Sequence, residues 1–451
     1  MEDNTNVEQE KREARHKRRK RSEFLTYMTV LLVLALLTVG GIFAAKYLYD
    51  GSEQITKEQE AALEEITQEL ENNEEEVVLS EPEPVEPEPE VPTFDEVADS
   101  IVNPIIESMT LEEKVAGLFI VTPEAITGVD TATMAGEGTQ KAIEKYPVGG
   151  IIYFSKNIQS KDQLTEMISK TASYCKYPMF FAVDEEGGDV ARIANSSIEV
   201  EKVGTAKEIG ETGDPNKAYV AGSVIASYLT ELGFNLDFAP VADVASVEDS
   251  FIGNRAYGSD FNTVGEFVAN AVTGLQENGV SACLKHFPGL GATSGDTHDE
   301  MVADERTTQD FKENEFLTFK AGIEAGTDFV MVSHISLPSI TGDNTPCCLI
   351  PAVVTDLLRG DLGYSGVVIT DALNMAAISE YYSSDEAAIM ALKAGCDVLL
   401  MPENFEEAYN GLVKAVKEDG TLDEKRIDDA LRRILKVKYK AQINEELAKT
   451  N

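Results

Sequence analysis

Eight short apolar runs, each of a length that suits a buried strand, recur along this chain. They are Leu118–Val121, Gly150–Phe154, Met179–Val183, Asn235–Val241, Ser281–Leu284, Phe329–Val332, Gly366–Ile369 and Val398–Met401. Amphipathic segments with helical spacing lie between them, for example Lys161–Tyr174, Lys217–Leu232 and Ser384–Ala394. Because strands that alternate with helices form parallel β/α units, we expect an α/β fold with a single TIM-like (β/α)8 barrel. A doubly wound open sheet is the alternative, which periodicity alone does not exclude.

Polar residues follow these runs at the point where six of the strands would end. They are Asp184, Glu185, Glu186, Asp243, Lys285, His286, Ser333, His334, Thr370, Asp371 and Glu403. A single acidic residue at such a place is more often a helix N-cap, but a ring of polar strand ends indicates a functional site. Asp371 directly ends a run of β-branched residues, which would hold its carboxylate rigidly. It is a candidate nucleophile or charge stabiliser, with an N-cap before Ala372 as the alternative.

The stretch from Lys285 to Met301 (KHFPGLGATSGDTHDEM) has the composition of a loop, with a proline, three glycines and several small hydroxyl residues. Asp296 and His298 lie two residues apart inside it. A carboxylate beside an imidazole can orient the ring and raise its basicity, so this pair is a candidate acid/base near neutral pH. The chain has four histidines, and two of them lie in this stretch. The alternative is a polar surface turn with an incidental His.

The N-terminal region predicts a membrane anchor and a spacer. Residues 11–21 are strongly basic, and the 22 residues Phe24–Ala45 are uncharged and mostly apolar, about the length of a bilayer-spanning helix. Basic residues before such a helix favour a cytoplasmic N-terminus and an exported C-terminal part. The alternative is a cleaved signal peptide, whose apolar core is usually about 7–15 residues long. Residues 81–92 (EPEPVEPEPEVP) favour an extended, solvated spacer.

These patterns divide the chain into four parts. We predict a basic cytoplasmic tail over residues 1–23, a transmembrane anchor over 24–49, an acidic Pro/Glu-rich stalk over 50–93 and the barrel over 94–451. The predicted location is the cell membrane, crossed once, with the barrel domain extracytoplasmic.

Charge and cysteine content exclude several classes of function. The net charge of −42 excludes nucleic acid as a partner, because nucleic-acid binding needs clustered cations. The five cysteines have no metal-site spacing, and we expect no disulfide framework. No phosphate-binding glycine loop and no metal cluster is evident, so we expect neither cofactor nor metal. The sequence does not indicate an oligomeric state.

Five stretches in order carry a resemblance to a known family. They are AVDEEGG (182–188), NLDFAPVADV (235–244), IGNRAYG (252–258), KHFPG followed by DTH (285–289 and 296–298) and GVVITDALNM (366–375). Over residues 94 to about 441 the chain resembles family 3 glycoside hydrolases, and within them the bacterial β-N-acetylglucosaminidases.

The resemblance implies a retaining, two-step mechanism on a TIM-like barrel. Asp371 would be the nucleophile, and His298 paired with Asp296 would be the acid/base. Sugar hydroxyls in the first subsite would be bound by Asp184, Arg192, Arg255, Lys285 and His286. His334 matches a family position near the pocket. The implied substrate is terminal β-linked N-acetylglucosamine, from cell-wall glycan (peptidoglycan).

Two departures from the family pattern concern substrate preference. Leu290 stands where this branch usually has a His, and Asp189 stands where a basic residue often follows the EGG element. Neither removes a residue of the implied mechanism, but an Asp at this place would repel acidic muramic-type aglycones. Other possible functions are a phosphorylase, a β-glucosidase on the same scaffold, or a non-catalytic glycan-binding module.

Overall fold

The computed structural model describes residues 92–293, 295 and 301–450. In this part of the chain, eight parallel strands form one sheet in the order β10-β1-β2-β3-β6-β7-β8-β9. The strands are β1 (Phe119–Val121), β2 (Gly150–Ile152), β3 (Phe180–Val183), β6 (Leu236–Asp237), β7 (Ser281–Phe287), β8 (Phe329–Val332), β9 (Val367–Thr370) and β10 (Leu399–Leu400). A bridge between Ile369 and Val398 joins the two ends of this order, so the sheet closes into a barrel. Each predicted apolar run overlaps one of these strands, which confirms the barrel and excludes the open sheet.

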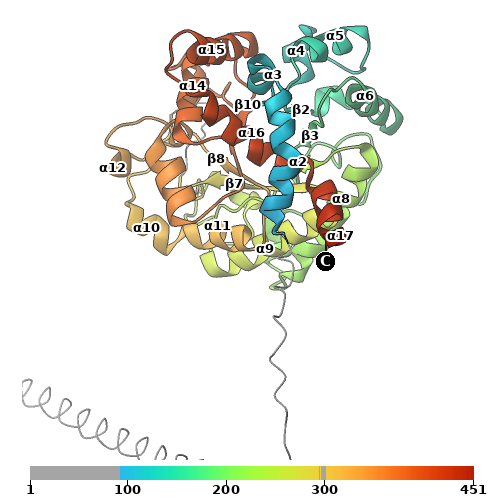
Figure 1. Ribbon diagram of the computed structural model, residues 1–451. Coiled ribbons are helices and arrows are strands. Elements are labelled where there is room, and N and C mark those ends of the chain that lie inside the picture. The colour runs from blue at the N-terminus through green and yellow to red at the C-terminus, as the bar shows by residue number, and fades with distance from the viewer. Residues whose placement is uncertain (1–91, 294, 296–300, 451) are drawn as a thin grey trace, which may run out of the picture. The chain divides into compact units, whose positions relative to one another are not determined.

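Helices surround the strands on all sides, as Figure 1 shows. They are α2 (Phe94–Ser108), α3 (Leu111–Ala116), α4 (Pro123–Thr127), α5 (Glu137–Lys145), η1 (Ser155–Asn157), α6 (Lys161–Ser173), α7 (Ala206–Gly210), α8 (Asn216–Leu232), η2 (Gly253–Arg255), α9 (Phe261–Glu277), α10 (Thr308–Glu313), α11 (Glu315–Glu324), α12 (Pro338–Thr341), η3 (Cys347–Leu349), η4 (Ala352–Asp361), α13 (Ala376–Ser379), α14 (Ser384–Ala394), α15 (Phe405–Lys417), α16 (Glu424–Lys438) and α17 (Lys440–Thr450). A short hairpin of β4 (Glu185–Gly187) and β5 (Val190–Ala191) follows β3. The three helices predicted from apolar spacing agree with α6, α8 and α14 to within one residue at each end.

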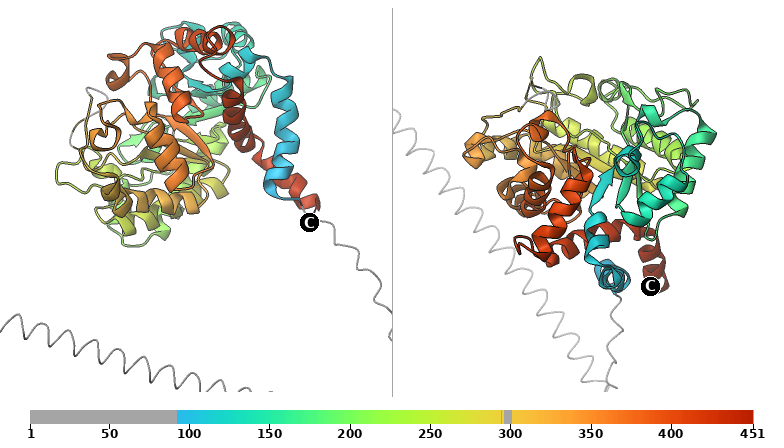
Figure 2. Two further views of the ribbon diagram at one scale, coloured as in Figure 1. Left: turned by 60° about the vertical axis from the view of Figure 1, so that its left-hand side comes forward. Right: turned by 90° about the horizontal axis from the view of Figure 1, so that it is seen from above.

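The N-terminal end of the barrel is closed by packing and by charge. Phe180 of β3 and Phe329 of β8 meet edge to face inside it, with ring centroids 5.1 Å apart. Asp397, which precedes β10 and is fully buried, is ion-paired by three guanidinium groups from two helices, Arg359 of η4 and Arg426 and Arg433 of α16. In Figure 2, α2 lies beside α16 and α17 at this end of the barrel. The opposite end, to which the strands point their carboxyl termini, is therefore the open one.

The fold prediction needs one correction, which concerns the transmembrane helix placed before the barrel. Within residues 92–293, 295 and 301–450, no helix is both long enough and apolar enough to cross a membrane. The longest described helices, α8 and α9, have 17 residues each and bury one face against their neighbours, whereas a span needs about 20 apolar residues. The predicted anchor, 24–49, lies outside the described residues, as does most of the predicted stalk. Over the residues that the structure describes, the fold is therefore the α/β barrel alone.

Candidate active site

A cavity of about 280 Å³ lies at the carboxyl ends of the strands. Its polar wall comes from residues that follow different strands, which converge here because the strands are parallel and the barrel is closed. These residues are Asp184, Glu186, Arg192, Arg255, Lys285, His286, Asp371 and Asn374. Apolar side chains such as Phe154, Phe238 and Met331 supply the rest of the wall. A small polar ligand with many hydroxyl groups fits a hollow of this size and composition.

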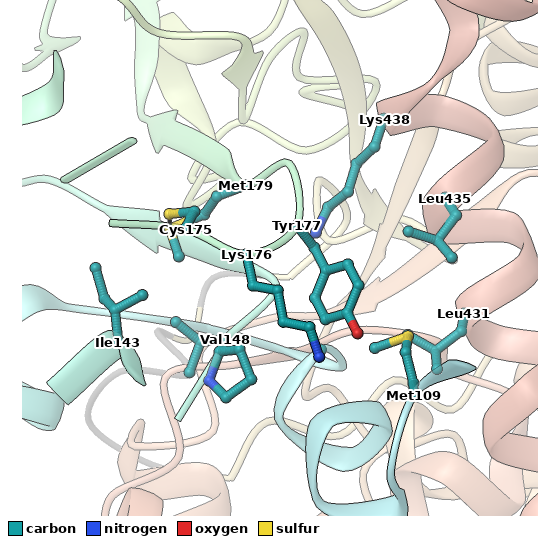
Figure 3. A pocket seen from close by; sticks show the side chains of 12 residues that line it. Met109, Ile143, Val148, Cys175, Lys176, Tyr177, Met179, Leu431, Leu435 and Lys438 are labelled. Carbon is teal, nitrogen blue, oxygen red and sulfur yellow. Dashed lines mark hydrogen bonds between the residues drawn. The ribbon is translucent and has the colours of Figure 1, made fainter. Parts of the chain in front are cut away.

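A second hollow lies at the opposite end of the barrel, and Figure 3 shows it from close by. It is lined mainly by apolar side chains, among them Ile143, Val148, Met179, Leu431 and Leu435. Burial lowers the pKa of Lys438 here to about 7, and its amine lies 5.0 Å from the centre of the Phe180 ring. The hollow has a volume of only about 10 Å³, about the room that one water needs. This hollow is too small for a sugar, and the cavity at the carboxyl ends of the strands, where the polar strand ends converge, is the candidate active site.

Four charged side chains form a cluster in the wall of that cavity. The Lys285 ammonium lies 2.7 Å from Glu186 Oε1 and 3.0 Å from Asp184 Oδ1. Arg255 donates from Nε and from a terminal nitrogen to the two oxygens of Glu186, both at 2.8 Å. This paired geometry is the strong form of a charge-assisted hydrogen bond. The cluster therefore holds two cations and two carboxylates in fixed positions before any ligand arrives.

Glu186 is the centre of this cluster. Burial opposes its ionisation, since its side chain is only 6% exposed, but the Lys285 ammonium and the Arg255 guanidinium overcome burial and lower the pKa of Glu186 to about 2. The same pairing keeps Lys285 charged, because the neighbouring carboxylates raise its pKa although burial would lower it. The cations in the cavity wall are thus permanent hydrogen-bond donors at physiological pH.

The hairpin of β4 and β5 brings Arg192 back over the cavity. Gly187 and Gly188 both have positive φ, and a Cβ at Gly188 would lie 2.4 Å from Thr205 Cγ2, so this turn requires glycine. After the turn, Arg192 lies with a terminal nitrogen 3.6 Å from Asp184 Oδ2 and its guanidinium 5.7 Å from the centre of the Phe154 ring. The turn at Gly187 and Gly188 therefore positions Arg192 in the cavity wall.

His286 is held in place by Asp243, which follows β6. Asp243 Oδ2 lies 2.6 Å from His286 Nδ1 and accepts the backbone N–H of His286 at 3.0 Å, while Oδ1 accepts the N–H of Leu290 at 2.6 Å. Because Nδ1 faces a carboxylate, the opposite ring nitrogen is left for a ligand. Leu290 itself lines the cavity.

Asp371 follows β9 directly and lines the same cavity. One of its oxygens accepts the N–H of Ala372 at 2.7 Å. Burial raises the pKa of Asp371, but the imidazoles of His334 and His286, when protonated, act in the opposite direction, as do this hydrogen bond and Lys285. The resulting pKa lies below the ordinary value, so the group is a carboxylate at neutral pH.

The structure brings together six of the eight predicted site residues. Asp184, Arg192, Arg255, Lys285, His286 and Asp371 all line the cavity, and His334 lies directly beneath the backbone that follows Asp371. Asp296 and His298 lie outside the described residues, so the predicted acid/base pair stays a prediction. Within the described ranges, no group of three or more His, Cys, Asp or Glu side chains is arranged to hold a metal ion.

Two residues with clear parts in the site received no role from the sequence. Glu186 connects Lys285 to Arg255, and Asp243 orients His286. Both belong to the polar residues that follow the ends of strands, so the sequence pattern did include them. The sequence does not show which residues they bind, because Glu186 and Lys285, for example, lie on different strands and meet only in the closed barrel.

The cluster predicts a large cost for replacing Glu186 by Gln. Breaking a buried ion pair leaves its partners buried and unpaired, so we expect a loss of about 3 kcal/mol in the free energy of unfolding at pH 7. Because the folded-state pKa of about 2 lies below the ordinary 4.5, the carboxylate stabilises the fold fully above pH 4.5 and loses this effect as the pH falls towards 2. The difference between Glu186→Gln and wild type should therefore shrink in acid.

Denaturant unfolding at a series of pH values measures this difference. Glu137→Gln is the matched control, because Glu137 belongs to an exposed pair with Lys141 that contributes at most about 1 kcal/mol. Equal stability of Glu186→Gln and Glu137→Gln at neutral pH would contradict the assigned role.

Comparison with known proteins gives the following relationships. Residues 110–437 match the profile of the glycosyl hydrolase family 3 N terminal domain. A β-hexosaminidase of Stenotrophomonas maltophilia (strain R551-3) is 34% identical over 271 residues, which are 59% of this chain and 80% of that protein.

Solved structures show the same relationship. A family 3 β-N-acetylglucosaminidase from Paenibacillus sp. str. FPU-7 superposes with a TM-score of 0.70 at 33% identity, over 75% of this chain and 64% of that one, so this chain spans just under two thirds of its length. A β-N-acetylhexosaminidase from Beutenbergia cavernae superposes with a TM-score of 0.65 at 30% identity, over 73% of this chain and 99% of that one.

Proposed function

This chain belongs to glycosyl hydrolase family 3 and is a glycosidase of the β-hexosaminidase type, and from that premise we propose that it removes terminal β-linked N-acetylglucosamine with retention of configuration. The observation that carries this proposal is an ionised carboxylate, Asp371, in a sugar-sized cavity beside a fixed cluster of hydrogen-bonding charges. A retaining enzyme needs such a carboxylate beneath the sugar ring.

Asp371 is the proposed nucleophile. Its carboxylate attacks the anomeric carbon as the glycosidic C–O bond breaks, which forms a covalent glycosyl ester. In the second step water attacks the same carbon from the other face and releases the Asp371 carboxylate. Its low pKa supports this role, because the group is ionised before the sugar binds.

His298 is the proposed acid/base, oriented by Asp296, and the support for this pair is its place in the sequence. The imidazolium gives its proton to the leaving oxygen in the first step, and the neutral ring removes a proton from water in the second. A neighbouring carboxylate favours the imidazolium, which helps His298 to hold that proton until the bond breaks.

Five side chains of the cavity wall are the proposed contacts for sugar hydroxyls. Lys285, Arg192 and Arg255 donate hydrogen bonds, and Asp184 accepts them. His286 presents the ring nitrogen that Asp243 does not engage. Because their mutual ion pairs fix these groups in advance, binding costs little reorganisation and places the anomeric carbon near Asp371.

We propose cell-wall glycan as the natural source of the substrate. The sequence element Asp296–His298 and the names of the relatives favour N-acetylglucosamine, and the exported domain predicted from residues 1–49 would meet peptidoglycan. Asp189 is exposed in the turn between β4 and β5, beside Val190 of the cavity wall, so among cell-wall glycans we expect an uncharged aglycone to be a better substrate than an acidic muramic one.

Product analysis of the purified full chain tests this function. We expect release from an aryl β-N-acetylglucosaminide, with little release from the matching β-glucoside, and free N-acetylglucosamine as product whether or not phosphate is present. A sugar 1-phosphate in phosphate buffer would instead identify a phosphorylase, which a neutral His acid/base permits because it does not repel phosphate. Binding of the two aryl glycosides without turnover of either would identify a glycan-binding module.

We also propose that the catalytic domain lies outside the cytoplasm. The support comes from sequence alone, since basic residues 11–21 precede the apolar stretch 24–45 and both lie outside the described residues. Protease added to intact protoplasts should digest the domain. Protection until the cells are lysed would overturn this proposal.

A further inference from the structure

His334 is fully buried behind the candidate nucleophile and is bonded through both ring nitrogens. It follows β8, and its Nε2 lies 2.9 Å from the carbonyl oxygen of Ala372, the residue next to Asp371. Its Nδ1 lies 3.2 Å from the Sγ of Cys348, in η3. Three segments that are distant in sequence thus meet at one imidazole: the end of β8, the end of β9 and η3.

We propose that Cys348 and His334 are positioning residues for the reaction, with the Cys348 thiol fixing the imidazole and the imidazole fixing the backbone that carries Asp371. This inference rests on the proposed function, because it assigns Asp371 the nucleophile's part. Neither side chain touches the sugar in this account. Both affect the reaction only by fixing the position of the Asp371 carboxylate.

The chemistry of the two ring nitrogens shows how the thiol can restrain the imidazole. A carbonyl oxygen only accepts, so Nε2 must carry a hydrogen and donate it to Ala372. In the neutral ring, Nδ1 has no hydrogen and accepts a hydrogen bond from the Cys348 thiol. In the imidazolium, Nδ1 donates to the sulfur instead. In either state the Cys348 sulfur engages Nδ1, and its removal takes one hydrogen bond from a buried ring nitrogen, which weakens the restraint on the imidazole.

The thiol suits this part because it keeps its hydrogen. Cys348 is fully buried, and burial raises its pKa well above the ordinary value. Its own position is fixed from the other side, since the Cys396 thiol donates to the Cys348 carbonyl oxygen at 3.4 Å. The backbone beside it is held as well, because the N–H of Cys347 donates to the carbonyl oxygen of Ile335 at 2.9 Å. The backbone of Cys348 is therefore held by hydrogen bonds on both sides.

The effect on Asp371 is geometric. Asp371 is held by its own N–H, which donates to Val332 at 2.9 Å, and its side chain accepts the N–H of Ala372. The bond from His334 fixes the carbonyl of that same Ala372, in the peptide plane one residue further on, so Ala372 is restrained on both sides of its Cα. A nucleophile displaced by about 1 Å can lose roughly 10²-fold in rate, which sets the scale for losing this restraint.

The test compares variants at neighbouring cysteines. For Cys348→Ala we expect kcat to fall by about 10-fold or more while KM stays within about 2-fold, since the sugar contacts are untouched. Cys348→Ser offers an O–H to Nδ1 and should restore most of kcat. Cys347→Ala is the matched control, because Cys347 is equally buried and shares the same short helix. It should lose stability without this loss of kcat.

The outcomes separate the inference from the proposed function. Unchanged kcat in Cys348→Ala, or equal losses of kcat in the Ala and Ser variants at 348 and in Cys347→Ala, would overturn the positioning role. Should Cys348→Ala fail to fold, Cys348→Val takes its place, because it fills the space and removes the hydrogen bond between the thiol and Nδ1. If Asp371→Ala keeps wild-type turnover, the proposed function itself fails, whatever the cysteine variants show.

Discussion

Replacement of Asp371 by Ala is expected to lower kcat for an aryl β-N-acetylglucosaminide by at least about 10⁴-fold, the scale on which removal of a covalent nucleophile acts. The cavity and its charge cluster stay intact in this variant, so sugar binding should persist. Steady-state kinetics measures the loss, and isothermal titration with N-acetylglucosamine measures the remaining affinity.

A small anion gives this experiment a sharper readout. In Asp371→Ala, azide can enter the space of the lost carboxylate and attack the anomeric carbon directly. One displacement inverts the configuration, so the product should be the α-glycosyl azide, whereas any azide adduct that wild type forms through two displacements is β. Wild-type turnover in Asp371→Ala would remove Asp371 from the mechanism.

The second large effect is expected at His298, and it should depend on the leaving group. For a natural sugar aglycone, His298→Ala should lose roughly 10²–10⁴-fold in kcat/KM, the usual contribution of a general acid. For an aryl group that leaves without a proton, the first step should be nearly normal, and slow hydrolysis of the glycosyl enzyme should then limit kcat. A burst of phenol followed by slow turnover is the expected time course.

His286→Ala is the control for the His298 variant. His286 lines the cavity and is held by Asp243, but it has no proposed proton-transfer step. Its loss should raise KM for good and poor leaving groups alike. If His298→Ala shows the same uniform effect, the acid/base assignment is wrong.

The barrel could be predicted from sequence because its signal is local and repeated. A strand such as Val367–Thr370 is buried on both faces and is therefore a continuous apolar run, and each amphipathic helix between strands has its own period. Asp371 could be predicted for the same reason, since it directly ends such a run. The predicted and observed C-terminal ends of α8 agree because Gly233, in the left-handed conformation, ends the helix.

The parts that sequence could not supply depend on contacts between distant segments. Glu186 has its low pKa only because Lys285 and Arg255 reach it across the barrel. Nothing near Cys348 in the chain points to His334, which it meets only once β8 and η3 are packed together. The membrane helix was predicted from hydropathy alone, and no described helix supports it.

Trapping of the covalent intermediate tests the central claim most directly. A 5-fluoro N-acetylglucosaminyl fluoride has a good leaving group, and its ring fluorine slows both steps, so the glycosyl enzyme should accumulate. After quenching and digestion, mass spectrometry should find one sugar per chain, esterified to Asp371 in the peptide containing GVVITDALNM. An unlabelled Asp371 in enzyme that still turns over this reagent, or a label on another carboxylate, would contradict the account.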